Sequence, residues 1–419
     1  MTRMRRFVGL VLVLALVAAL GTGCGKSGTS GGTSGGTSGR DKNKQAEPDQ
    51  PPIKIGVITD KSGALQNYGK QQVNGLKLGL EYATGGTMTV LGRKIDLIIE
   101  DDGSNPEKGV QAVRKLFDQD KIDILQGTDN SGVALAVIPE VEKNKKIFMV
   151  DPAAADAITG ANYSRYVFRT GRNVSQDSLA GGKYLAEKGK KFMNFAPDYA
   201  FGKDSAAAWS AVIKANGGEM IGDIFAPLDT KDFTSYLQRL AAAKPDGVVV
   251  TWAGAGAVQL FQQIAELGLY QKMTVFTGIG DIPSLKAMGT ASDGLVGVNT
   301  YFHLLPKNSV NDWLVKEHKA RFKEPPDLFT SGGFAAGVAI VEGLKKAGST
   351  DAEALIKAME GMSFATPKGT MTFRPEDHQA LQAMYVVQLK KAEGYDYLVP
   401  TLLKELSPQD TVPPIKNKK

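Results

Sequence analysis

Few side chains in this 419-residue sequence are of the kinds that carry out catalysis or bind metal. The three histidines, His303, His318 and His378, are far apart in the chain, and Cys24 is the single cysteine. A zinc site or an activated thiol needs several such side chains close together. We therefore expect each histidine to be an ordinary surface or core residue, and we expect neither a metal site nor a Cys/His nucleophile pair.

Two further patterns match catalytic motifs and are rejected. Glu100-Asp101-Asp102 ends a predicted strand and could act as an acid/base pair, but solvated turn residues before a helix are the favoured interpretation. Gly28-Thr29-Ser30-Gly31-Gly32 matches G-x-S-x-G, yet its Gly/Ser/Thr repeat offers no strand-to-helix elbow. No dinucleotide fingerprint or P-loop follows a predicted strand. The sequence therefore predicts a protein that is not an enzyme and has no cofactor.

The first 23 residues are typical of a secretory signal peptide. Arg3, Arg5 and Arg6 precede an apolar run over residues 7–20, which is short for a membrane span, and small residues follow. Cys24 comes next, as in the lipobox of bacterial lipoproteins, although Gly21 stands where lipoboxes usually carry leucine. We expect residues 1–23 to be removed and Cys24 to carry a lipid that ties the protein to a membrane.

The segment after Cys24 predicts a tether. Residues 24–52 contain Gly-Gly-Thr-Ser repeats and polar residues, which bury too little apolar surface to fold and behave as a flexible spacer. A basic tail is expected over residues 406–419. The formal net charge of the whole chain is +6, and no basic stripe with interleaved aromatic residues is present. Nucleic acid is therefore not an expected partner.

The remaining chain alternates between strand and helix patterns. Apolar runs at residues 53–59, 95–99, 122–125 and 147–150 predict strands, with helical periodicity between them. The pattern restarts after residue 172, with strands expected at 192–196, 220–225, 248–251 and 273–277. Repeated βα units predict two parallel sheets flanked by helices, and such sheets bind ligands beyond the carboxyl ends of their strands.

Several short stretches carry a resemblance to a known family. They include Ser62-Gly63 with Tyr68-Gly69, Asp151-Pro152-Ala153-Ala154, Phe168-Arg169-Thr170 and Tyr199-Ala200-Phe201-Gly202. Because these stretches occur in this order behind a lipobox, the chain resembles type I periplasmic solute-binding proteins. The resemblance is strongest to the leucine/isoleucine/valine-binding group that serves ABC importers. The resemblance covers residues 53 to about 390.

The resemblance implies an α/β fold of two Rossmann-like lobes that close on a ligand. Three crossover strands would join the lobes near residues 169–173, 299–301 and 372–374. The N-terminal lobe would combine residues 53–171 with 301–373, and the C-terminal lobe residues 172–300 with 374–405. It also implies a monomer outside the cytoplasm, on a cell surface or in a periplasm, that delivers a small molecule to an ABC permease.

The resemblance also implies a set of contact residues. In amino-acid-binding members, a serine after the third strand holds the ligand's carboxylate, and Ser131 matches it. Ser131 also reads as a helix N-cap, where an anion is favoured, although capping alone would explain it. The contact residues that we predict are Tyr68, Asn130, Ser131, Ala153, Ala155, Phe201, Trp252, Asp281 and Phe334.

The sequence departs from the amino-acid binders at polar positions. Ala155 replaces a threonine, Phe201 and Ala253 replace tyrosines, and Gly280 replaces the acidic partner of the ammonium. Asp281, one residue away, could substitute for that acid. The predicted ligand is a branched-chain or other hydrophobic amino acid. The alternatives are an apolar or aromatic carboxylate or amide, and a sensory binding protein with the same fold.

Overall fold

The first parallel sheet begins the part of the chain that the computed structural model describes, residues 50–417. Its six strands have the order β2-β3-β1-β4-β5-β6, and only β2 runs antiparallel to its neighbour. The strands are β1 (Ile53–Thr59), β2 (Thr89–Val90), β3 (Arg93–Asp101), β4 (Ile124–Gly127), β5 (Ile147–Val150) and β6 (Val167–Arg169). The sheet confirms the four strands predicted before residue 151.

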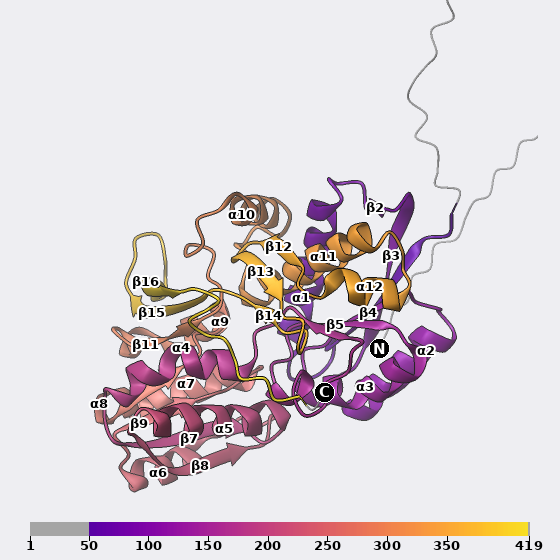
Figure 1. Ribbon diagram of the computed structural model, residues 1–419. Coiled ribbons are helices and arrows are strands. Elements are labelled where there is room, and N and C mark those ends of the chain that lie inside the picture. Colours follow the sequence, from indigo (N-terminus) through magenta and orange to yellow (C-terminus); the bar gives the residue numbers. More distant parts are fainter. Residues whose placement is uncertain (1–49, 418–419) are drawn as a thin grey trace, which may run out of the picture. The chain divides into compact units, whose positions relative to one another are not determined.

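Helices cover both faces of this sheet (Figure 1). The helices of this first lobe are α1 (Gln66–Ala83), α2 (Pro106–Asp118), α3 (Ser131–Asn144), α10 (Ser309–Phe322), α11 (Leu328–Ala347) and α12 (Ala352–Met359), with a 3₁₀ turn, η1 (Asp156–Ile158). α2 and α3 lie on one face, and α1, α11 and α12 lie on the other. Asn105 caps α2 through the N–H of Lys108, and Pro106 occupies the first turn, where its missing N–H breaks no helical hydrogen bond.

α1 and α11 pack with their backbones in direct contact. A Cβ at Gly75 would lie 2.0 Å from the carbonyl oxygen of Thr330, and one at Gly333 would lie 2.0 Å from that of Gln72. Only glycine fits at such distances. This close packing brings the N-terminal ends of the two helices together.

The second parallel sheet has four strands in the order β10-β9-β7-β8. They are β7 (Lys191–Pro197), β8 (Glu219–Ala226), β9 (Gly247–Val250) and β10 (Thr274–Thr277). The helices of this second lobe are α4 (Val174–Ala186), α5 (Ala200–Ala215), α6 (Thr234–Ala243), α7 (Gly256–Glu266), α8 (Leu269–Lys272) and α9 (Ile282–Met288), with the 3₁₀ turn η2 (Thr290–Ser292). All four strands predicted after residue 172 are confirmed.

Two small antiparallel sheets accompany the chain where it passes between the lobes. One has the order β11-β15-β16, formed by β11 (Val296–Asn299), β15 (Met384–Lys390) and β16 (Val399–Leu406). The other has the order β12-β13-β14, formed by β12 (Ser363–Thr366), β13 (Gly369–Phe373) and β14 (Ala380–Leu381). The expected third crossing, at residues 372–374, falls at the end of β13, which pairs with β14, while β15 pairs with β11. The exact lobe boundaries stay a prediction.

The chain beyond β16 returns to the first lobe. The guanidinium of Arg374 donates to the carbonyl of Pro413 (2.7 Å), and the Nζ atom of Lys416 lies 2.6 Å from Oδ2 of Asp156. The basic tail expected over residues 406–419 is therefore anchored through residue 416. Within residues 50–417 no helix has the length and apolar character needed to cross a membrane. The expected signal peptide, Cys24 and most of the tether lie outside the described residues.

Candidate ligand-binding cavity

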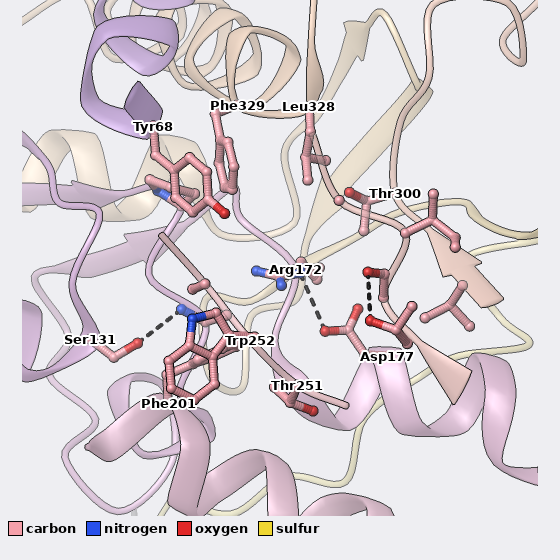
Figure 2. A pocket seen from close by; sticks show the side chains of 18 of the residues that line it. Tyr68, Ser131, Arg172, Asp177, Phe201, Thr251, Trp252, Thr300, Leu328 and Phe329 are labelled. Atoms are coloured by element: carbon pink, nitrogen blue, oxygen red, sulfur yellow. Dashed lines mark hydrogen bonds and ion pairs between the residues drawn. The ribbon is translucent and has the colours of Figure 1, made fainter. Parts of the chain in front are cut away.

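A cavity of about 90 Å³ lies beyond the carboxyl ends of strands from both parallel sheets (Figure 2). Its walls include the loops that follow β4 and β5 of the first lobe and those that follow β9 and β10 of the second. One water-sized group needs about 10–15 Å³ by this measure, so the cavity has room for about six to nine such groups. The place is the one predicted from the βα pattern, and the size suits a small solute.

Ser131 lines the cavity and is held by the loop after β5. Its Oγ atom accepts the backbone N–H groups of Ala154 and Ala155, both at 3.1 Å. A hydroxyl oxygen has two lone pairs, so the hydroxyl keeps only its proton for a ligand. Ser131 therefore presents a hydrogen-bond donor to the cavity.

The prediction that Ser131 caps its helix is wrong. The N-cap of α3 is Asn130, whose Oδ1 accepts from the N–H groups of Gly132 (2.8 Å) and Val133 (3.2 Å). An asparagine in an extended conformation before the first helical residue is an ordinary cap. Asn130 is buried in this role and does not line the cavity.

The loop after β5 contributes less to the cavity than expected. Ala154 and Pro152 line it, whereas Ala153 and Ala155 do not. The N–H of Ala153 donates to the carbonyl of Thr128 (3.0 Å), and the carbonyl of Ala155 accepts from Arg169 (2.6 Å). The backbone groups proposed to contact a ligand are thus used inside the protein.

The N-terminal ends of α1 and α11 form an aromatic wall. Tyr68 and Phe329 stack with their ring centroids 3.9 Å apart, and both line the cavity. The predicted wall residue Phe334 lies farther along α11, is fully buried and packs against Tyr82 and Trp313. The structure therefore brings Phe329 to the cavity in place of Phe334.

The opposite wall comes from the second lobe. Phe201 and Trp252 line the cavity as predicted, together with Tyr199. Trp252 packs edge-on against Phe233, with ring centroids 4.9 Å apart. This packing holds the indole at the cavity, so this wall presents the rings of Phe201 and Trp252.

A charged pair lies between the two walls and was missed by the sequence analysis. The Nε atom of Arg172 lies 3.3 Å from Oδ2 of Asp177, and both residues line the cavity. Asn173 and Gln176 form a capping box at the start of α4, which fixes the backbone between the two charged residues. Burial raises the pKa of Asp177, and Arg172 acts in the opposite direction. The sequence signal that could have identified Arg172 is its place at a predicted crossing, directly before Asn173, the N-cap of α4.

Asp281 does not line this cavity. Its Oδ1 caps α9 by accepting from the backbone N–H (3.2 Å) and the hydroxyl (2.5 Å) of Ser284. The carboxyl lines a separate small pocket beside Tyr68 and Gly254, and burial raises its pKa. Gly280, at the position of the expected acid, lines the main cavity without a side chain to offer.

Asp129 is a further acid at the cavity. Its Oδ2 accepts from the Thr59 hydroxyl (2.8 Å) and from the N–H of Asp60 (2.9 Å), whereas its Oδ1 has no partner among the described residues. Burial raises the pKa of Asp129 well above its usual range, with nearby Asp102 adding to the shift. Burial therefore opposes the charged form of this carboxyl.

Three hydrogen bonds join the second-lobe segments that follow β9 and β10 to the first lobe. The Tyr68 hydroxyl accepts the N–H of Gly254 (2.9 Å), and the carbonyl of Ala64 accepts that of Ala255 (3.0 Å). Oδ2 of Asp327, the N-cap of α11, accepts the N–H of Ile282 (2.8 Å). These contacts hold the loops of the second lobe against the first lobe.

The residues of the rejected motifs have structural roles wherever they fall within the described part of the chain. All three histidines are buried, and no group of three or more His, Cys, Asp or Glu side chains in residues 50–417 is arranged for a metal ion. Asp102 is not a solvated turn residue, because it is fully buried and contacts the hydroxyl of Thr128. The G-x-S-x-G match at residues 28–32 lies outside the described part.

Comparisons with known proteins give one family. The model of the periplasmic binding protein family matches residues 52–394. Leu/Ile/Val-binding protein homolog 6 of Brucella melitensis is 25% identical over 354 residues, which are 82% of this chain and 89% of the relative. An ABC-type branched-chain amino acid transporter structure from Rhodopseudomonas palustris CGA009 is 43% identical, with a TM-score of 0.75, covering 88% of this chain and 100% of that one.

A second solved structure holds an aromatic acid. It is a solute-binding protein of an ABC transporter from Rhodopseudomonas palustris BisB5 in complex with 3,4-dihydroxybenzoic acid. It is 31% identical, has a TM-score of 0.78, and covers 85% of this chain and 97% of that one. Proteins of this family are extracytoplasmic receptors and not enzymes. With its two parallel-sheet lobes and the cavity between them, the chain belongs to the periplasmic binding protein family, as a solute-binding protein of ABC transporters.

Proposed function

We propose that this protein captures an aromatic or other apolar carboxylate and delivers it to an ABC importer. The observation that carries the proposal is Arg172, the one cation among the described residues that line the main cavity. Its Nε faces Asp177, and its two Nη groups have no hydrogen-bond partner in the described part of the chain. A guanidinium with a free pair of N–H donors suits a carboxylate, which can accept both.

The other walls support the same ligand. Ser131 offers a hydroxyl proton to an acceptor, while Tyr68, Phe329, Phe201 and Trp252 offer apolar ring surface. Figure 2 shows these side chains around the same space as Arg172. A neighbouring family member crystallised with 3,4-dihydroxybenzoic acid is consistent with this chemistry. Few polar groups among apolar walls are typical of small-molecule sites.

A hydrophobic amino acid is the second candidate, as the sequence analysis favoured. Asp129 and Asp177 line the cavity and could receive an ammonium group, and a curated relative is named for leucine, isoleucine and valine. Two observations argue against it. Asp177 already pairs with Arg172, and burial raises the pKa of Asp129, which disfavours its charged form. A buried ammonium without a carboxylate partner would be costly.

Calorimetric titration of the purified protein with benzoate, leucine and phenylalanine tests the proposal. We expect benzoate to bind and both amino acids to bind at least ~100-fold more weakly, because a buried unpaired charge costs several kcal/mol. Binding of leucine without benzoate would replace this proposal with the amino-acid candidate.

Asp281→Asn gives a matched control for the ammonium question. Asparagine caps helices as well as aspartate does, so α9 keeps its cap. We expect the affinity for benzoate to stay within about twofold, because Asp281 does not line the main cavity. If leucine binds to the wild type and Asp281→Asn abolishes that binding, Asp281 is the ammonium partner after all.

We further propose that Cys24 carries a lipid and that residues 24–52 tether the binding domain to the membrane. A spacer of this Gly/Ser-rich kind and length has a root-mean-square reach of ~30 Å, enough for the domain to tilt toward a permease. Cys24→Ser tests the anchor. The variant should leave the membrane fraction of cells, and its retention there would refute lipidation.

Delivery to an importer and sensing by a membrane receptor use the same fold. Relatives and structural neighbours described as ABC-transporter proteins support delivery. Loss of labelled benzoate uptake in cells that lack this protein is the expected result, and unchanged uptake with a lost transcriptional response would support sensing. We propose a monomer, which sedimentation of the purified protein would test.

A further inference from the structure

A small chamber lies directly behind Arg172. It has a volume of about 20 Å³ and is lined by Asp151, Lys368, Thr300 and Arg172, among others. Arg172, Thr300, Pro152, Leu328 and Phe329 line both this chamber and the main cavity, so the two spaces are adjacent. The volume is enough for one water-sized group.

Asp151 is a buried carboxyl without a hydrogen-bond donor. The residue is 1% exposed, and its Oδ2 has no partner among the described residues. Two glycines leave room for the carboxyl: a Cβ at Gly332 would lie 2.7 Å from Oδ2, and a Cβ at Gly171 would lie 3.4 Å from Oδ1. Buried carboxyls are normally hydrogen-bonded, so this one is arranged to receive a donor that the protein itself does not supply.

The charges around the chamber decide which kind of donor fits. Lys368 and Arg172 both act on Asp151, opposing the rise in its pKa that burial causes. The Nζ atom of Lys368 donates to Oε1 of Gln382. Lys368 and Arg172 already balance the carboxyls of Asp151 and Asp177, so an ammonium group would leave a net positive charge in this space. A neutral hydroxyl carries no such cost, because it can donate to Asp151 and accept from an N–H of Arg172.

We propose that this chamber receives a hydroxyl group of the ligand, so that the preferred ligand is a hydroxy-substituted aromatic carboxylate. The proposal rests on the carboxylate ligand proposed above and adds a second polar contact to it. Arg172 then contacts both polar groups of the ligand, with the carboxylate in the main cavity and the hydroxyl toward Asp151. Asp151 becomes the residue that selects hydroxylated acids over the unsubstituted acid.

The test compares benzoate with 2-, 3- and 4-hydroxybenzoate by calorimetry on the full mature protein. We expect at least one hydroxy isomer to bind about tenfold or more tightly than benzoate, because a buried hydrogen bond to a charged group is strong. The matching methoxybenzoate should lose this advantage, since a methoxy oxygen cannot donate. If benzoate binds as tightly as every hydroxy isomer, the chamber holds only water and the inference is wrong.

Asp151→Asn checks the assignment to this residue. The ratio of benzoate to hydroxybenzoate dissociation constants should fall several-fold, with the thermal midpoint confirming a folded variant. An unchanged ratio would exclude Asp151 as the acceptor, and the methoxy comparison decides the matter if the variant does not fold. Benzoate binding without a hydroxyl preference overturns this inference alone. If only phenylalanine binds, or none of these acids does, the proposed function fails as well.

Discussion

The two walls of the cavity are built in different ways. The first-lobe wall rests on α1 and α11, whose backbones touch at glycines, and this contact places Tyr68 and Phe329 in a stack. The second-lobe wall consists mainly of the segments after β7, β9 and β10. Those after β9 and β10 meet the first lobe through three hydrogen bonds, whereas Phe201, after β7, packs against Ala154 of the first lobe. One wall is therefore fixed by helix packing, and the other is held by contacts that can separate.

The difference indicates how the site opens. Breaking a few hydrogen bonds costs far less than separating two packed helices, so the second-lobe loops are expected to move away from a preformed aromatic wall. Arg172 lies at the first passage between the lobes, where such motion hinges. Substitutions can test whether the first wall is rigid and whether Arg172 provides the affinity. They can also test whether the hydrogen bonds that Tyr68, Ala64 and Asp327 accept from the second lobe hold the site closed as a clasp.

The largest expected effect concerns the fixed wall. Gly333→Ala would place a Cβ 2.0 Å from the carbonyl oxygen of Gln72, so the helices must move apart. We expect the free energy of unfolding, measured with urea, to fall by about 3 kcal/mol or more.

Gly343→Ala on the same helix is the matched control. Its Cβ would lie 3.0 Å from the flexible side chain of Met359 and make an ordinary contact of 3.9 Å with Leu355, so the variant should be close to wild type in stability. Equal losses in the two variants would mean that the α1–α11 contact is no more rigid than the rest of the lobe.

The next effect concerns the charged pair between the walls. Arg172→Met removes the cation that faces the ligand and leaves Asp177 unpaired. We expect the dissociation constant for benzoate, measured by calorimetry, to rise about 100-fold, since hydrogen bonds to charged groups contribute about 1.5–3 kcal/mol.

Asp177→Asn should act in the opposite direction. Without the negative charge of Asp177, the positive charge of Arg172 is no longer partly balanced, and benzoate should bind a few-fold more tightly. A weaker affinity in Asp177→Asn would indicate that the acid itself holds a cationic group of the ligand.

The third prediction concerns the clasp residue Asp327. Burial raises its pKa from 3.8 to about 7, with Asp281 adding to the rise. Between these values the folded state holds a proton that the unfolded state has released, so the stability contributed by this group falls as the pH rises. The slope is at most about 1.4 kcal/mol per pH unit for one group.

Urea unfolding of wild type and Asp327→Asn between pH 4 and 8 isolates this group from other buried acids. As the pH rises to about 7, we expect the free energy of unfolding of the wild type to fall relative to that of the variant. Above about pH 7 the two stability curves should run parallel. Parallel curves throughout would show that Asp327 is not strained at the closed clasp.

The smallest expected effect comes from one hydroxyl between the walls. Tyr68→Phe leaves the N–H of Gly254 without its acceptor in the closed form, whereas water can satisfy it in an open form. We expect ligand affinity to fall about fivefold, corresponding to about 1 kcal/mol. Tyr82→Phe, on the same helix, is the control. An equal effect there would argue against a clasp at Tyr68.

Much of the fold could be predicted from local pattern. The runs at 53–59 and 147–150 are the observed β1 and β5, and the other predicted strands overlap their observed positions. Buried parallel strands are short apolar runs between helical periods, so their signal is local. The small sheet in which β13 pairs with β14 was not predicted, because such short strands leave no clear mark on the sequence pattern.

The site was predicted less well because side-chain roles depend on what else lies nearby. Ser131, Tyr68, Phe201 and Trp252 reach the cavity, but Phe334 is one and a half turns along α11 from Phe329 and faces the core. Asp281 has a local partner in Ser284 and caps α9. Arg172 and Asp151 were not predicted as ligand contacts, because the spaces that they line are formed by residues from distant parts of the chain.

The sequence by itself determined the class of fold, the order of its elements and the ends of the strands where a ligand would bind. These follow from periodicity, caps and turn residues that act over a few positions. The tertiary structure alone decided which side chains share the cavity, which acids are used as caps, and that Asp151 is buried without a donor beside Arg172. The reason is physical: burial and charge at one point are set by residues far apart in the chain, and only folding brings them together.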